Sequence, residues 1–248
     1  KPTVINNVET LSWVPAIVLR GGPWYRDQGA NGAKGLRLVS ISGDVNRPGV
    51  YEAPFGLTAR EHIERLGSGM RDGQMLKAIA PSGPSSGYLP AQLAVKSLPD
   101  KFVKAKVPPG AETYAILDLP LDGDTLKLMD AMLGAALVVV GERACMVDMA
   151  RNTTRFFRNE SCGKCVPCRL GSQKLATMLD QIVAGRFDPK GLDLVKELAQ
   201  TMVDTSICGL GMVASNPFSS LIRHFPDELE AHALHGRCPA GVCPGLAR

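Results

Sequence analysis

The pattern of hydrophobic and polar positions divides the chain into two kinds of structure. Between Gly35 and Ser42 hydrophobic and polar residues alternate, which is the period of a half-buried β-strand. A turn cluster of Gly, Asp, Asn and Pro follows at 43–49, and hydrophobic residues resume at Val50. This order predicts a β-hairpin over residues 35–51.

Further strands and one helix are expected before residue 121. Thr58 and Glu61 have the spacing of a capping box, so a short helix is expected to begin there and to end at Gly67. Strands are expected at 76–80 and 114–119. A strand–strand–helix–strand order with short links is typical of a β-grasp domain.

Two polar stretches of this first half are interpreted as irregular structure. Residues 97–112 contain prolines, a glycine and several lysines, and they predict a surface loop. The Gly- and Ser-rich stretch 82–87 is interpreted as a plain turn rather than an anion cradle, because it lacks the lysine and following helix of a phosphate-binding loop.

Hydrophobic residues recur at helical spacing after residue 122. Helices are expected from Asp124 through Leu133, from Met146 through Phe157, from Gly171 to Ala184, after Asp188 and Pro189 through Met202, and after Asn216 and Pro217 through Phe225. One short buried strand is expected at 135–140 between the first two. These helices are expected to pack as a compact bundle of about four.

The first 33 residues belong neither to the predicted β-strand region nor to the predicted helical region. The apolar segment Leu11–Arg20 ends at a Gly pair and predicts a short helix. The expected organisation is therefore an N-terminal segment (1–33), a β-grasp domain (34–121), a helical bundle (122–236) and a C-terminal tail (237–248). The expected fold class is α+β, with a ubiquitin-like β-grasp domain followed by the bundle.

Composition excludes several classes of protein. The 248 residues are 45% hydrophobic, enough for real cores, and the net charge of +4 is too small and too scattered to indicate nucleic-acid binding. The longest apolar run, 135–140, is far short of the ~20 residues that cross a bilayer. Seven cysteines, odd in number and clustered, indicate metal ligation in a reducing compartment, and the cytoplasm is the expected location.

Three cysteines close together carry the strongest chemical signal. Cys162, Cys165 and Cys168 lie within seven residues, so their sulfurs can converge on three corners of one four-iron cluster. Cys208, in the distant stretch 205–211, is the natural fourth ligand. Structural zinc more often uses two separated pairs of cysteines, and cysteines this close are poorly placed for disulfides. The sequence predicts a [4Fe-4S] cluster.

Charges beside these cysteines suit electron transfer. Reduction adds negative charge to a four-thiolate cluster, and Lys164 and Arg169 are placed to offset it, although Lys164 is as well explained as a solvated surface charge. Gly163 and Gly209 let the backbone bend closely around sulfur. The sequence contains no carboxylate pair, Ser/His/Asp order or zinc-protease motif, so it predicts no catalytic residue.

Three cysteines remain beyond these four. Cys238 and Cys243 flank a short turn-forming link, and Cys145 stands at the start of an expected helix. With His232, or His235 as its rival, they would make a tetrahedral zinc site that fastens the tail to the bundle. The alternative is that these thiols stay free, as small buried residues.

Three stretches together carry a resemblance to a known family. Residues 1–10, 160–169 and 206–211 are similar, in order, to the flavoprotein subunit of respiratory complex I and its relatives in soluble NAD-linked hydrogenases and formate dehydrogenases. The Cys238–Cys243 ending is more like the hydrogenase and formate dehydrogenase relatives. In that family an FMN- and NADH-binding domain precedes the first stretch, so the resemblance implies the C-terminal half of a longer protein.

The resemblance also implies cofactors and partners. It places Asn6, Asn7 and Thr10 at the FMN; without it, the two asparagines are better explained as a turn and a helix cap. It makes the β-grasp domain a soluble-ligand-binding module and implies other iron–sulfur subunits as partners, with no membrane insertion. The FMN would receive hydride from NADH, so the chain alone is not expected to bind FMN tightly or to oxidise NADH.

Two functions follow from these features. The first is an electron relay that passes single electrons between FMN and partner subunits of an NADH-oxidising or NAD-reducing enzyme. The second is a β-grasp and iron–sulfur scaffold that only docks partners. A reversible cluster potential distinguishes the relay from the scaffold.

Overall fold

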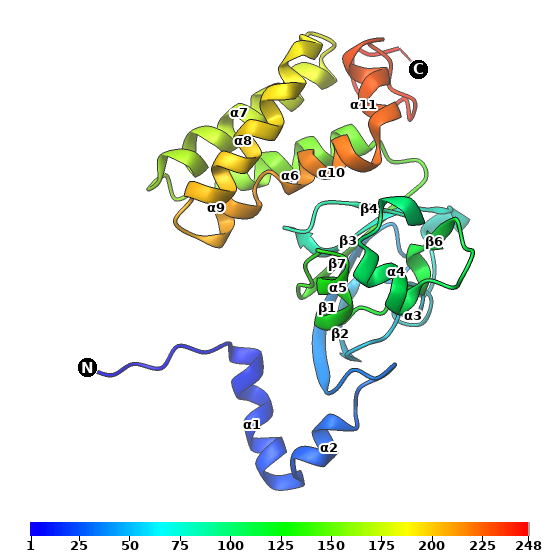
Figure 1. Ribbon diagram of the computed structural model, residues 1–248, viewed down its shortest axis with the longest axis vertical. Coiled ribbons are helices and arrows are strands. Elements are labelled where there is room, and N and C mark those ends of the chain that lie inside the picture. Colours follow the sequence, from blue (N-terminus) through cyan, green and yellow to red (C-terminus); the bar gives the residue numbers. More distant parts are fainter. Residues whose placement is uncertain (248) are drawn as a thin grey trace. The chain divides into compact units, whose positions relative to one another are not determined.

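The computed structural model describes residues 1–247 and consists of two compact units (Figure 1). The first unit contains residues 1–73 and 92–139, and the second contains residues 74–91 and the chain from 140 onward. Each unit is therefore assembled from two separate stretches, whereas the sequence pattern suggested domains that follow one another along the chain.

The first unit combines a sheet with short helices. Its elements are α1 (Val8–Arg20), α2 (Gly22–Arg26), β1 (Leu36–Gly43), β2 (Gly49–Pro54), α3 (Ala59–Glu61), a π-helical turn η1 (His62–Leu66), β5 (Gln92–Ala94), α4 (Asp100–Lys106), β6 (Thr113–Ala115), α5 (Gly123–Leu128), β7 (Ala136–Gly141) and the 3-10 turns η2 (Arg71–Gly73), η3 (Val95–Ser97) and η4 (Ile116–Asp118). The last residues of β7 pass into the second unit.

The predicted hairpin is present and has a parallel neighbour. Strand β1 pairs antiparallel with β2, and parallel with β7 from Ser40↔Ala136 onward. Val39 and Ile41 of β1 are buried together with Leu137 of β7. Strands from the beginning and the end of this unit therefore pair in one sheet. The sheet is mixed, because β1 has one antiparallel and one parallel neighbour.

Two predictions in this half are wrong. The strand expected at 114–119 is strand only as β6, which pairs with β5, and continues as the turn η4. The stretch 97–112 contains helix α4, whose Phe102 is fully buried with its ring edge-on to Tyr114, 5.1 Å between centroids. A Pro followed by an acidic residue is a helix start, and the surrounding breakers obscured it.

Helix α5 begins one residue earlier than expected and ends at Leu128, five residues before the expected end. Its cap is Asp122 rather than Asp124, because the Asp122 carboxylate accepts a 2.8 Å hydrogen bond from the backbone N–H of Thr125. Asp122 and Asp124 are equally good cap residues by type, and the folded backbone determines which of the two caps the helix.

The capping box at Thr58 is formed as predicted. Its side chain accepts the N–H of Glu61, and the Glu61 carboxylate accepts the N–H of Thr58 at 2.9 Å. Replacing Thr58 with Ala removes one of these two bonds, so the free energy of unfolding is expected to fall by about 1 kcal/mol. Urea denaturation of the two proteins measures the difference, and an unchanged free energy would contradict the capping role.

The second unit is mainly helical. Its elements are β3 (Leu76–Pro84), β4 (Leu89–Pro90), α6 (Met146–Glu160), α7 (Val166–Val183), a 3-10 turn η5 (Pro189–Gly191), α8 (Leu192–Thr205), α9 (Gly209–Val213), α10 (Asn216–His224) and α11 (Pro226–Ala233). Strands β3 and β4 form an antiparallel pair through Ala78↔Pro90 and Ile79↔Leu89.

The predicted hydrophobic stripes form the core of this unit. Leu175, Leu179 and Ile182 of α7 are fully buried, as are Met202 of α8 and Phe218 of α10. Helix α7 starts at Val166, five residues before the expected start, and so it includes part of the cysteine motif. The core thereby fixes the helix that carries the third cysteine.

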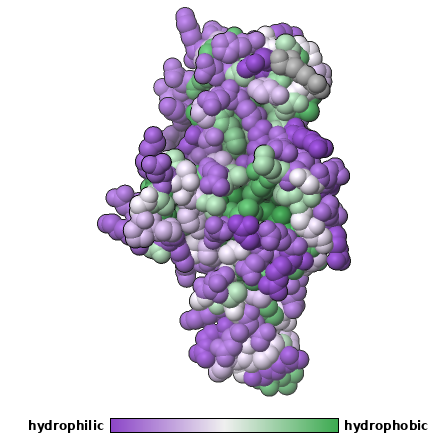
Figure 2. Space-filling model, turned by 90° about the vertical axis from the view of Figure 1, so that its right-hand side faces the viewer, coloured by the Kyte–Doolittle hydropathy of each residue, from purple (hydrophilic) through white to green (hydrophobic). Residues whose placement is uncertain are grey.

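The surface is mostly hydrophilic, with hydrophobic areas exposed in places (Figure 2). Helix α1 has no buried residue, and its Val8 and Val18 are 81% and 76% exposed. Among the described residues, no helix is long and apolar enough to cross a membrane.

Candidate metal centres

The first three cysteines lie where α6 gives way to α7. Cys162 is exposed in the connecting loop, Cys165 is the N-cap of α7, and Cys168 is buried in the first turn of that helix. Gly163 has φ +76°, a left-handed conformation that lets the loop reverse between the two helices. Pro167 is the second residue of α7, within the first turn, where its missing N–H costs no helical hydrogen bond.

The fourth cysteine lies on a second loop, which reaches the first. Cys208 is the exposed N-cap of α9, three residues after α8 ends. A backbone N–H of the same loop, that of Ile207, bonds to the sulfur of Cys165. With the N–H of Cys168 and the Arg169 cation, this bond lowers the pKa of Cys165 below its usual value.

The two loops also touch through a glycine. A Cβ atom at Gly211 would lie 2.6 Å from Ser206 Cβ and 2.9 Å from Cys168 Cβ, closer than real atoms approach. Only a residue without a side chain therefore lets α9 lie against the first turn of α7. Gly211 was missed by the sequence reasoning, because nothing local distinguishes it from Gly209.

Two serine hydroxyls lie in the same region, one of them without a partner in the described part of the chain. Ser206 is 5% exposed, and its hydroxyl has no hydrogen-bond partner among the described residues. Ser161 Oγ lies 3.3 Å from Cys168 Sγ. A cluster with sulfur acceptors between the loops would give the Ser206 hydroxyl a partner, so the donors present fit the group that the spacing predicts.

The two cations of the first loop differ. Arg169 folds back to donate a 2.6 Å hydrogen bond to the carbonyl of Gly163, and so its charge stays near Cys165. Lys164 is exposed. The charge-offsetting role of Arg169 stays a prediction, and Lys164 lies at the surface, as its alternative interpretation expects.

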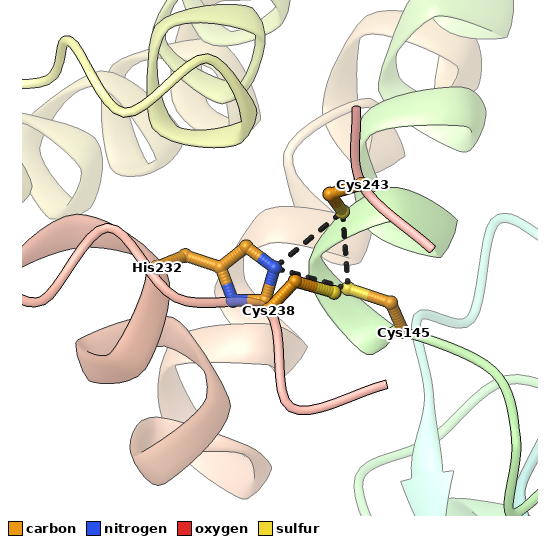
Figure 3. Close-up of side chains that lie close together, drawn as sticks. All are labelled: Cys145, His232, Cys238 and Cys243. Carbon is orange, nitrogen blue, oxygen red and sulfur yellow. Dashed lines mark hydrogen bonds between the residues drawn. The ribbon is translucent and has the colours of Figure 1, made fainter. Parts of the chain in front are cut away.

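The remaining three cysteines gather with a histidine at another place in this unit. The sulfurs of Cys145, Cys238 and Cys243 and a ring nitrogen of His232 all lie within 4.8 Å of one another, and all four residues are buried. Figure 3 shows the four side chains pointing toward one another. Cys145 caps α6, His232 is in the last turn of α11, and the other two lie in the tail.

The geometry selects between the two histidines. His232 is 1% exposed, whereas the His235 ring is 61% exposed and lies 3.7 Å from the carboxylate of Glu230. Only His232 therefore reaches the three sulfurs, as the first of the two alternatives predicted.

The thiols of this group lie in contrasting environments. Burial raises the pKa of Cys145 to about 11 and also raises that of Cys243. Burial would likewise raise the pKa of Cys238, but N–H groups of Cys243 and Val242 bond to its sulfur and bring it to about 6.

The residues implied at FMN lie at the start of α1. Asn7 caps this helix by accepting the N–H of Glu9 at 2.8 Å, and Asn6 accepts the N–H of Asn7. All of Asn6, Asn7 and Thr10 are exposed. The asparagines make the turn and cap of the simpler interpretation, and FMN contact stays a prediction.

Comparison with known proteins gives a consistent answer. The family described as the NADH-ubiquinone oxidoreductase-F iron-sulfur binding region matches residues 148–232, which include all four cysteines of the two loops. The chain is 36% identical over 247 residues to the NADP-reducing hydrogenase subunit HndC of Solidesulfovibrio fructosivorans, covering 99% of this chain and 46% of that protein.

Two further relatives agree. The F subunit of NADH-quinone oxidoreductase from Mycobacterium bovis is 38% identical over 239 residues, which cover 96% of this chain and 48% of that protein. A crystal structure of an NAD+-reducing [NiFe]-hydrogenase in the H2-reduced state matches with a TM-score of 0.73 at 34% identity, covering 94% of this chain and 35% of that one.

The chain spans about half the length of the curated relatives it matches. The recognition made from three short motifs is confirmed by similarity over nearly the whole chain. Residues 148–232 belong to the [4Fe-4S]-binding region found in the F subunit of NADH-quinone oxidoreductase and in its hydrogenase homologues.

Proposed function

We propose that this chain relays single electrons through a [4Fe-4S] cluster held by Cys162, Cys165, Cys168 and Cys208. The observation that carries the proposal is the close approach at Gly211, where the segment that carries Cys208 lies against Cys168 inside the matched iron–sulfur region. A cluster bound there accepts and returns one electron at a time.

The protein's own groups are suited to that task. The N–H groups of Ile207 and Cys168 and the cation of Arg169 surround Cys165 and offset the charge of its thiolate. Cys162 and Cys208 are exposed, so one side of the ligand set is open to a partner. The other side of the ligand set is enclosed by the protein, because Cys168 and Ser206 are buried.

The relatives indicate the setting in which this relay works. They are named as subunits of NADH-quinone oxidoreductase and of an NADP-reducing hydrogenase. We infer that this chain likewise acts with partner iron–sulfur subunits, and with FMN near Asn6, Asn7 and Thr10, in an NAD(P)-linked oxidoreductase. Formate dehydrogenase remains a further candidate from the motif resemblance.

The first unit suits a β-grasp domain. The β1–β2 hairpin is followed by α3, and β1 also pairs in parallel with β7. A central strand flanked by its hairpin partner and by a parallel late strand supports this assignment. Such a sheet would give the relay a docking module.

Anaerobic reconstitution of the unmodified chain with iron and sulfide tests the relay. It is expected to hold about four iron atoms and to take up about one electron from dithionite, with a reduced-state EPR signal that disappears on reoxidation. Repeated cycles without loss of iron support a relay. A cluster that stays in one state, or is destroyed by one cycle, would instead support the docking scaffold.

A further inference from the structure

Three cysteines and one histidine that the electron relay does not use form a separate buried group. Cys145, His232, Cys238 and Cys243 are each at most 5% exposed. Cys145 and Cys243 are 98 residues apart in the chain, yet their sulfurs lie 3.7 Å from each other. All seven cysteines are free, and this distance is far longer than the roughly 2.05 Å of a disulfide.

Three of the distances within the group are those of ligands around one small ion. Zinc ligands at their usual bond lengths stand about 3.8 Å apart for two sulfurs and about 3.6 Å apart for sulfur and nitrogen. Here the sulfurs of Cys145 and Cys243 are 3.7 Å apart, and His232 Nε2 lies 3.3 Å and 3.5 Å from them. Figure 3 shows these edges as dashed lines.

The imidazole is already oriented for a metal. His232 Nδ1 lies 2.7 Å from the backbone carbonyl of Glu228, which can only accept, so Nδ1 carries the proton. The lone pair is therefore on Nε2, the atom that faces the sulfurs. Metal-binding histidines are oriented by such a bond on their other nitrogen.

The sulfurs also have donors that suit thiolates. The N–H of Asp148 points to Cys145 Sγ at 3.4 Å, and N–H groups of Val242 and Cys243 bond to Cys238 Sγ. Buried neutral thiols have little need of several N–H donors, because sulfur in a thiol is a weak acceptor. The donors offset charge that a bound cation would also balance.

We propose that Cys145, His232, Cys238 and Cys243 bind one zinc ion as a closed, structural site. Two sulfurs and a nitrogen at tetrahedral spacing, with a third sulfur within 4.8 Å of each, favour zinc over harder cations. The group does not suit a four-iron cluster, in which each thiolate binds a different iron and the ligands stand farther apart. The site is independent of the proposed electron relay.

The ion would tie three parts of the second unit together. Cys145 is at the start of α6, His232 at the end of α11, and Cys238 and Cys243 in the tail after Gly236. The tail has no helix or strand among its described residues and is held by a few backbone bonds, including Cys238 N–H to the carbonyl of Ala247 at 2.7 Å. Zinc would fix it to the helix that leads into the first cysteine loop.

Metal analysis of the cluster-loaded chain tests the site. The unmodified protein purified with zinc present is expected to hold about one zinc per chain beside its iron. Cys238→Ser is expected to lose the zinc and to speed hydrogen exchange in residues 236–247, while the iron content stays unchanged. The matched variant Cys208→Ser should show the reverse, with iron lost and zinc kept.

Cobalt substitution of the unmodified chain gives a second measurement that does not depend on a variant folding. Cobalt bound by three thiolates and an imidazole is expected to show the intense visible bands of a tetrahedral site and sulfur-to-cobalt absorption in the near ultraviolet. One equivalent of zinc should abolish both. An unmodified chain that binds neither metal, or a Cys238→Ser variant that keeps its full zinc content, would overturn the proposal.

Discussion

Replacing Gly211 with alanine is expected to leave the chain folded but largely unable to hold its four-iron cluster. The new Cβ would lie 2.6 Å from Ser206 Cβ and 2.9 Å from Cys168 Cβ. Neither atom can move without its backbone, so α9 must shift away from the first turn of α7. The ligand on each side shifts with it, and thiolates must hold their positions closely to bind one cluster.

The measurement is iron per chain after anaerobic reconstitution, together with the reduced-state EPR signal. Iron is expected to fall from about four per chain to well below one, close to the level of Cys165→Ala, which lacks a ligand outright. Gly123→Ala is the control, since a Cβ there meets nothing within 4 Å and the residue lies in the first unit, which holds none of the cluster cysteines. Iron content in Gly211→Ala equal to that of the control would refute the role of this contact.

Replacing Lys77 with methionine is expected to destabilise the second unit by about 2–3 kcal/mol. Lys77 Nζ lies 2.6 Å from a carboxylate oxygen of Glu228, and the two side chains are only 20% and 16% exposed. The same ammonium donates to the carbonyl of Ala144, while the second Glu228 oxygen accepts the N–H of Met146. Without Lys77, a largely buried carboxylate loses the cation that pairs with it.

An exposed pair of the same length provides the control. Lys101 Nζ also lies 2.6 Å from a carboxylate oxygen, that of Asp130, but these side chains are 50% and 67% exposed. Lys101→Met is expected to cost less than about 1 kcal/mol because water screens the pair. The two pairs lie in different units, so exchange of buried amide hydrogens in each unit measures the free energy separately. Equal losses would show that burial does not set the strength of the pair.

The Lys77 pair matters for the proposed zinc site because it positions the same helix. Glu228 lies one turn before His232 on α11, and its backbone carbonyl holds His232 Nδ1. The side chain and the backbone of one residue therefore orient α11 and the imidazole together. We expect Lys77→Met to weaken zinc retention as well as stability.

Several elements followed from the sequence alone because their signals are local. The alternation at 36–42, the capping box at Thr58 and the hydrophobic stripes of α7 and α8 depend on neighbours within a few residues. The cysteine spacing at 162–168 is local in the same sense, and it was enough to identify an iron–sulfur region that the comparisons confirm.

The tertiary structure decided what depends on contacts between distant residues. The pairing of β1 with β7, the burial of Phe102 in α4 and the close approach at Gly211 are set by how elements pack, and no local pattern records that packing. The sequence could name Cys145, His232, Cys238 and Cys243 as a set, but only the folded chain brings their four ligand atoms within 4.8 Å. The sequence gives the chemical type of each residue. The distance between two residues that are far apart in the sequence depends on how the elements between them pack.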